Sequence, residues 1–118
     1  MAKILIADDD KVMRELLITL LELEGDVGLP VSKPEDVIPL VREEMPDLIL
    51  IDVHLSGGDS FSTVQALKAD PALREIPVLM ASGMDVKPEC LKAGADGFIM
   101  KPFRPAELLD RIKSAIAG

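Results

Sequence analysis

Four aspartates stand directly behind apolar runs of the chain. Asp8, Asp9 and Asp10 follow one run of four apolar residues, and Asp52 follows another. Carboxylates held close together disfavour one another's ionised form, and a hard divalent cation with oxygen ligands relieves that repulsion. If folding brings the two groups together, we expect them to bind Mg²⁺, or Mn²⁺ in its place.

A hydroxyl group and an ammonium group occupy corresponding places later in the chain. Ser82 follows the apolar residues 77–81, and Lys101 follows residues 97–100. Taken alone, an aspartate at the end of a strand is often a helix N-cap, and we assign Asp10 that role. A purely structural ion pair between Asp52 and Lys101 is the alternative to a functional site. Four such strand ends together favour the functional interpretation.

The segments that position these groups alternate between strands and helices. Strands are predicted at Lys3–Ala7, Val27–Val31, Asp47–Asp52, Pro77–Ala81 and Gly97–Met100. Helices are predicted up to about Glu24, from a capping-box pattern at Ser32–Glu35, and over about Ser60–Ala69, Val86–Ala93 and Pro105–Ala117. The alternation predicts an α/β fold with a doubly wound, five-stranded parallel sheet, (βα)5, in a three-layer α/β/α sandwich. Ligand sites of such sheets lie at the carboxyl ends of the strands, where all the groups above would meet.

Several single residues carry local predictions. Gly25 should close the first helix. Pro30 places the second strand near a sheet edge, and Pro39 should kink or shorten the second helix. Ile18 falls outside the apolar stripe of the first helix, so we expect it to be exposed. Cys90 is the only cysteine; it cannot form an internal disulfide, and we expect it to be packed as a small apolar residue.

Composition excludes several classes of protein. The 118 residues suffice for one domain, carry a net charge of −8, and include no Trp or Tyr, which argues against direct binding of nucleic acid. The longest apolar run has four residues, so no membrane insertion is expected. The lone cysteine suits a cytoplasmic location. Residues 1–118 are expected to form this single domain, with no output domain in this chain.

Four motifs occur together in this order and spacing, at residues 4–9, 47–52, 76–82 and 94–103. With them the whole chain resembles the response-regulator receiver domains of bacterial two-component signalling, of the chemotaxis-regulator type. The resemblance implies a flavodoxin-like fold. It also implies that Asp52 is the phosphoacceptor, and that Asp8, Asp9, Asp52 and the backbone carbonyl of His54 hold Mg²⁺.

The resemblance assigns the remaining groups as well. Ser82 and Lys101 would bind phosphoryl oxygens, and Ser82 and Phe98 would couple phosphorylation to a conformational switch. The peptide bond before Pro102 would be cis. The expected partners are a histidine kinase or histidine phosphotransfer protein and a downstream protein target. Self-catalysed phosphorylation and dephosphorylation at Asp52 are expected, without turnover of a separate substrate.

The sequence departs from the family in two loops. Leu55-Ser56 stands where relatives often have Met-Pro. The interval from Ser82 to Gly94 is about three residues short, most of one helical turn. This predicts a fourth helix of about two turns, with Asp85 as its cap and Pro88 in its first turn.

Two other functions fit parts of the sequence. A receiver fold could serve as a binding module that is never phosphorylated. The Asp8-Asp9-Asp10 run also matches the Asp-x-Asp signature of haloacid-dehalogenase-type phosphatases, in which Asp8 would be the nucleophile and Asp10 the acid–base group. That family generally needs a longer chain and a second acidic pair, which is missing here.

Overall fold

Five parallel strands lie side by side in the order β2-β1-β3-β4-β5 in the computed structural model, which describes residues 1–117. The strands are β1 (Lys3–Ala7), β2 (Val27–Val31), β3 (Leu48–Asp52), β4 (Val78–Ser82) and β5 (Gly97–Met100). The helices are α1 (Lys11–Leu23), α2 (Val37–Glu44), α3 (Ser60–Ala69), α4 (Lys87–Ala93) and α5 (Pro105–Ala117), with a 3₁₀ turn, η1, at Pro34–Asp36. The predicted (βα)5 fold class is confirmed.

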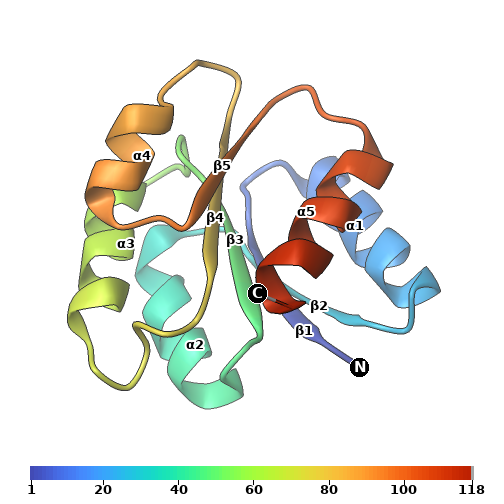
Figure 1. Ribbon diagram of the computed structural model, residues 1–118, viewed down its shortest axis with the longest axis horizontal. Coiled ribbons are helices and arrows are strands. Elements are labelled where there is room, and N and C mark those ends of the chain that lie inside the picture. The colour runs from blue at the N-terminus through green and yellow to red at the C-terminus, as the bar shows by residue number, and fades with distance from the viewer. Residues whose placement is uncertain (118) are drawn as a thin grey trace.

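Helices cover both faces of the sheet (Figure 1). α1 and α5 lie on one face, and α2, α3 and α4 lie on the other. β1, β3, β4 and β5 contribute alternate side chains to two separate cores because successive residues of a strand point to opposite faces. Ile49 and Ile51 of β3 pack toward α2, α3 and α4, whereas Leu48 and Leu50 pack toward α1 and α5. The molecule is therefore the predicted three-layer sandwich.

Backbone hydrogen bonds extend the sheet by one residue beyond its carboxyl edge. The N–H of Asp8 donates to the Val31 carbonyl at 3.1 Å, and the N–H of Lys101 donates to the Ser82 carbonyl at 2.8 Å. Asp52 ends β3 and lies opposite Ala81. The chemistry-bearing residues thus sit on backbone that the sheet itself holds in place.

The first helix begins and ends as predicted, but its exposed face differs. Asp10 caps α1 by accepting a hydrogen bond from the Met13 N–H at 3.2 Å, and Gly25 adopts φ +83° just after the helix. Ile18 is half-buried rather than exposed, because it packs against the backbone of Gly28, where an added Cβ would lie 2.8 Å from Ile18 Cγ1. Val12, an apolar residue in the first turn of α1, is 75% exposed.

The starts of two short helices also differ from prediction. The capping box at Ser32–Glu35 does not form: the chain makes η1, with Lys33 before it and no side-chain cap. α2 then has eight residues, with Pro39 in its first turn, where the missing N–H costs nothing. α4 has the expected two turns and Pro88 in its first turn, but Val86 precedes it and Asp85 does not cap it.

Two further expectations concern burial. Cys90 of α4 is fully buried, and burial, together with the charge of Glu89, raises the pKa of its thiol. This agrees with its predicted role as a packed apolar side chain. Within residues 1–117, no helix combines the length and the apolar character that crossing a membrane requires.

Candidate functional site

Lys101 joins two buried carboxylates at the carboxyl edge of the sheet. Its Nζ lies 3.0 Å from Asp8 Oδ2 and 2.5 Å from Asp52 Oδ2. Asp8 is 5% exposed and Asp52 is 9% exposed. The three groups come from residues at or just after the carboxyl ends of β1, β3 and β5, so folding brings together residues up to 93 positions apart in the sequence.

The second oxygen of each carboxylate is bound by backbone. Asp8 Oδ1 accepts from the Asp10 N–H at 2.9 Å, and Asp52 Oδ1 accepts from the His54 N–H at 2.8 Å. The backbone carbonyls of the same two aspartates are also held: Arg14 donates to that of Asp8 at 2.6 Å, and the Ser60 hydroxyl donates to that of Asp52 at 2.7 Å. Both carboxylates therefore have fixed orientations.

The site holds more negative than positive charge. Burial works to lower the pKa of Lys101, but the hydrogen bonds and charges of Asp52 and Asp8 outweigh it and raise that pKa. The ammonium therefore stays protonated, and it balances only one of the two carboxylates it contacts. Negative charge with little solvent around it attracts a further cation.

Asp9 lies next to this site in sequence but is bound elsewhere. Its Oδ2 accepts hydrogen bonds from both the hydroxyl and the backbone N–H of Ser56, the latter at 3.2 Å. The side-chain hydrogen bond from Ser56 lowers the pKa of Asp9, although partial burial opposes it. Asp9 also lines an open pocket with Ser32, Lys33 and Gly57. Its carboxylate is thus ionised and turned toward the loop after β3.

The carboxylates predicted to hold a metal ion do not surround one common point in this structure. Among residues 1–117, no three His, Cys, Asp or Glu side chains are arranged to hold a metal ion. The side chain of His54 is exposed, in keeping with its expected contribution through the backbone alone. The donor set of Asp8, Asp9 and Asp52 is nevertheless all oxygen and carries surplus negative charge, which suits a hard divalent cation.

The two predicted switch residues are both buried. Ser82 is fully buried, and its hydroxyl accepts a hydrogen bond from the Met84 N–H at 3.0 Å. Phe98 is 8% exposed and belongs to the core beneath α2, α3 and α4. Ser82 shares the edge of the sheet with Lys101 but forms no hydrogen bond with the two carboxylates there. The Lys101–Pro102 peptide bond is cis.

Sequence reasoning missed three supporting residues. Arg14 and Ser60 hold the backbone beside Asp8 and Asp52, and Ser56 binds Asp9. The sequence could have indicated the role of Ser60. It is the first residue of a helix, immediately after the N-cap Asp59, and therefore lies near the end of the preceding strand. Ser56 had no such signal, because it lies in a loop, 47 positions from Asp9, and does not stand at a strand end.

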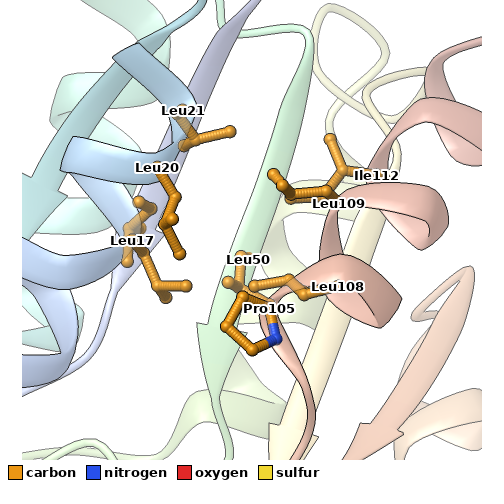
Figure 2. A pocket seen from close by; sticks show the side chains of 9 residues that line it. Leu17, Leu20, Leu21, Leu50, Pro105, Leu108, Leu109 and Ile112 are labelled. Carbon is orange, nitrogen blue, oxygen red and sulfur yellow. The ribbon is translucent and has the colours of Figure 1, made fainter. Parts of the chain in front are cut away.

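A small apolar pocket between α1 and α5 is chemically distinct from this edge. Figure 2 shows leucines of α1 and α5 facing each other across Leu50 and Pro105. Every residue that lines it is apolar: Ile6, Leu17, Leu20, Leu21, Leu50, Pro105, Leu108, Leu109 and Ile112. The pocket offers packing surface and no group for catalysis, so the carboxyl edge of the sheet is the candidate site.

Known proteins resemble this chain over nearly its full length. Residues 4–113 match the family described as response regulator receiver domain. The phosphate regulon transcriptional regulatory protein PhoB of Pseudomonas aeruginosa is 34% identical over 116 residues, which cover 96% of this chain and 51% of PhoB. The chain thus spans about half the length of the curated relatives it matches.

Solved structures give the same result. A putative response regulator from Chloroflexus aurantiacus has a TM-score of 0.92 and 29% identity, with 99% of this chain and 98% of that chain covered. The signal receiver domain of a signal transduction histidine kinase from Syntrophus aciditrophicus has a TM-score of 0.91 and 30% identity, with 100% and 92% covered.

Proposed function

The chain belongs to the response regulator receiver domain family, as its motifs predicted, and on this basis we propose that Asp52 accepts a phosphoryl group. The phosphoryl donor is the phosphohistidine of a histidine kinase or a histidine phosphotransfer protein. The observation that supports this most directly is the buried pair of carboxylates, Asp8 and Asp52, on the single ammonium of Lys101. A structural ion pair needs only one carboxylate, and the second one here leaves negative charge that a cation can balance.

The proposed reaction is a displacement at phosphorus. A carboxylate oxygen of Asp52 forms a bond to phosphorus while the bond between phosphorus and the donor imidazole nitrogen breaks, and the imidazole leaves with the electron pair. Lys101 balances negative charge on the phosphoryl oxygens. The hydrogen bond from the His54 N–H orients the attacking carboxylate. The product is an aspartyl phosphate.

Mg²⁺, or Mn²⁺, would be held by Asp8, Asp9, Asp52 and the backbone carbonyl of His54. When bound, the cation supplies positive charge against the carboxylates and the phosphoryl oxygens. These ligands are all oxygen, as a hard cation requires. The surplus negative charge around Lys101 favours cation binding, and Asp9 is exposed enough to turn toward it.

Phosphorylation would then act through Ser82 and Phe98. The modification adds about one and a half to two negative charges beside Lys101. The Ser82 hydroxyl leaves the Met84 N–H to donate to a phosphoryl oxygen, which moves the loop after β4. Phe98, on the adjacent strand, repacks into the space that this loop vacates. The signal is read by a downstream protein.

Direct binding of nucleic acid is not part of this proposal. PhoB is named as a transcriptional regulatory protein, and this chain matches about half of it. The net charge of −8 opposes contact with phosphate backbones, so we assign this chain the signalling step and not DNA contact. Autophosphorylation and dephosphorylation at Asp52 are the only chemistry we propose, with no separate turnover reaction.

Incubation with Mg²⁺ and acetyl phosphate tests the site. We expect a phosphoryl group on Asp52 by mass spectrometry of peptides, and Asp52→Asn should abolish it. Asp59→Asn is the matched control, because Asp59 caps α3 and lies outside the site. Phosphate on Asp8 with turnover of phosphate esters would support the phosphatase alternative. A folded chain that is never labelled, even with excess donor, would support the unphosphorylated binding module.

A further inference from the structure

Of the three carboxylates proposed to hold the cation, those of Asp8, Asp9 and Asp52, only that of Asp9 accepts no hydrogen bond from Lys101, and Ser56 holds it. Both donors of Ser56, its hydroxyl and its backbone N–H, reach the same atom, Asp9 Oδ2. Lys101 donates only to Asp8 and Asp52. The three carboxylates are therefore divided between two internal partners, a lysine and a serine.

This division has a geometric consequence for cation binding. Asp9 faces an open pocket shared with Lys33, Ser56 and Gly57, while Asp8 and Asp52 point to the half-buried ammonium of Lys101. No three acidic side chains among residues 1–117 meet around one point as a result. A cation that is to contact all three carboxylates therefore needs Asp9 to change its orientation, and Ser56 holds that carboxylate through Oδ2.

We propose that Ser56 competes with the divalent cation for the Asp9 carboxylate and thereby weakens the binding of Mg²⁺ to this chain. The inference rests on the proposed function, since it assumes that Asp8, Asp9 and Asp52 hold the cation. Ser56 is thus a positioning residue that sets how much Mg²⁺ the site needs before it can be phosphorylated.

The opposite role is also chemically reasonable, because hydrogen bonds to a ligating carboxylate often strengthen a metal site. Such support requires the bound carboxylate to face its fellow ligands. Here Asp9 faces the pocket with Ser56 and Gly57, and Asp8 and Asp52 are bound to a different partner. Competition therefore fits the contacts, and support does not.

Two variants weaken the contact between Ser56 and Asp9 to different extents. Ser56→Ala removes the hydroxyl and leaves the N–H, and Ser56→Pro removes both donors. Ser62→Ala is the matched control, because the Ser62 hydroxyl donates to Asp59 Oδ2 at 2.9 Å and makes the same kind of contact outside the site. The exposed position of Ser56 leaves the core untouched by either change.

The primary measurement is the dissociation constant for Mg²⁺, by calorimetry and by amide shifts of residues 8–10 and 52–56. A hydrogen bond to a charged group, partly exposed, corresponds to binding about threefold to tenfold tighter in Ser56→Ala. Ser56→Pro should bind at least as tightly, and Ser62→Ala should match the parent. The Mg²⁺ concentration that half-saturates phosphorylation by acetyl phosphate should fall by the same factor, with the saturated rate unchanged.

Equal or weaker Mg²⁺ binding in Ser56→Ala would overturn the competition while leaving the proposed function intact, provided that the parent binds Mg²⁺ and is labelled on Asp52. Absence of Mg²⁺ binding in every variant would instead overturn the proposed function, and this inference with it. The two failures are therefore distinguishable in one titration series.

Discussion

Two lysines of this molecule occupy similar environments and have different partners. The side chains of Lys68 and Lys101 are 18% and 24% exposed, and each bridges distant segments. Lys68 Nζ lies 3.0 Å from the Arg74 carbonyl, 2.9 Å from the Ile76 carbonyl and 2.8 Å from Asp96 Oδ2. Lys101 Nζ instead contacts two carboxylates, those of Asp8 and Asp52.

The difference separates a contact whose charges balance from one with surplus negative charge. At Lys68 one positive charge meets one carboxylate and two neutral carbonyls, so donors, acceptors and charge all balance. Asp96 also accepts from the Val78 N–H at 2.8 Å, which ties the contact to the start of β4. At Lys101 the hydrogen bonds are satisfied but the charge is not. Surplus charge at a buried edge marks the position where a cation and a phosphoryl group would enter.

The largest expected effect is on phosphorylation, in Lys101→Met. Loss of the ammonium removes the charge that balances the phosphoryl oxygens, and the rate of Asp52 labelling should fall on the order of 100-fold or more. Initial rates with acetyl phosphate at saturating Mg²⁺ measure this. Lys68→Met should keep the parental rate. A similar fall in the labelling rate of Lys101→Met and Lys68→Met would contradict the proposed difference between the two lysines.

The next largest effect is on stability, in Lys68→Met. The change leaves the Arg74 and Ile76 carbonyls without the Lys68 ammonium and leaves Asp96 with the Val78 N–H as donor, which should lower the free energy of unfolding by about 1–3 kcal/mol. Urea titration followed by circular dichroism measures it. Lys92→Met, at an exposed position of α4, is the control and should stay within about 0.5 kcal/mol of the parent. An unchanged urea midpoint in Lys68→Met would contradict the structural role of Lys68.

The smallest expected effect is the pH dependence of the stability that Lys101 contributes. Burial works to lower the pKa of Lys101, but the hydrogen bonds that its ammonium donates to Asp52 and Asp8 outweigh burial and raise that pKa. A lysine whose pKa is higher in the folded than in the unfolded state stabilises the fold fully below 10.5, and this is lost only as the pH rises through the raised value. The stability difference between the parent and Lys101→Met should therefore stay constant from about pH 7 to pH 9. A difference that shrinks over that interval would contradict the raised pKa.

Local patterns accounted for the strands, most helices and the place of the site. Apolar runs of neighbouring residues predict β1 and β3 without knowledge of the tertiary structure. In a parallel sheet, the residue that follows each run lies at the carboxyl edge. Asp8, Asp52 and Lys101 could be placed together on that basis alone. The family resemblance added the role of each, and the structure supplied the ion pairs.

Contacts between loops could not be derived in the same way. Ser56 reaches Asp9 because the loops after β3 and β1 leave adjacent strands. Lys68 reaches Asp96 because α3 packs against α4, and Asp96 lies in the turn that follows α4. Ile18 is covered because Gly28 of the edge strand has no side chain, a fact that the period of α1 alone does not contain.

What this sequence determined by itself was therefore the alternation of elements and the identity of the groups at one edge of the sheet, since periodicity and strand ends are properties of neighbouring residues. The tertiary structure alone decided how three carboxylates are shared between Lys101 and Ser56. That choice depends on which donors two loops bring within hydrogen-bonding distance, and no spacing along the chain encodes it.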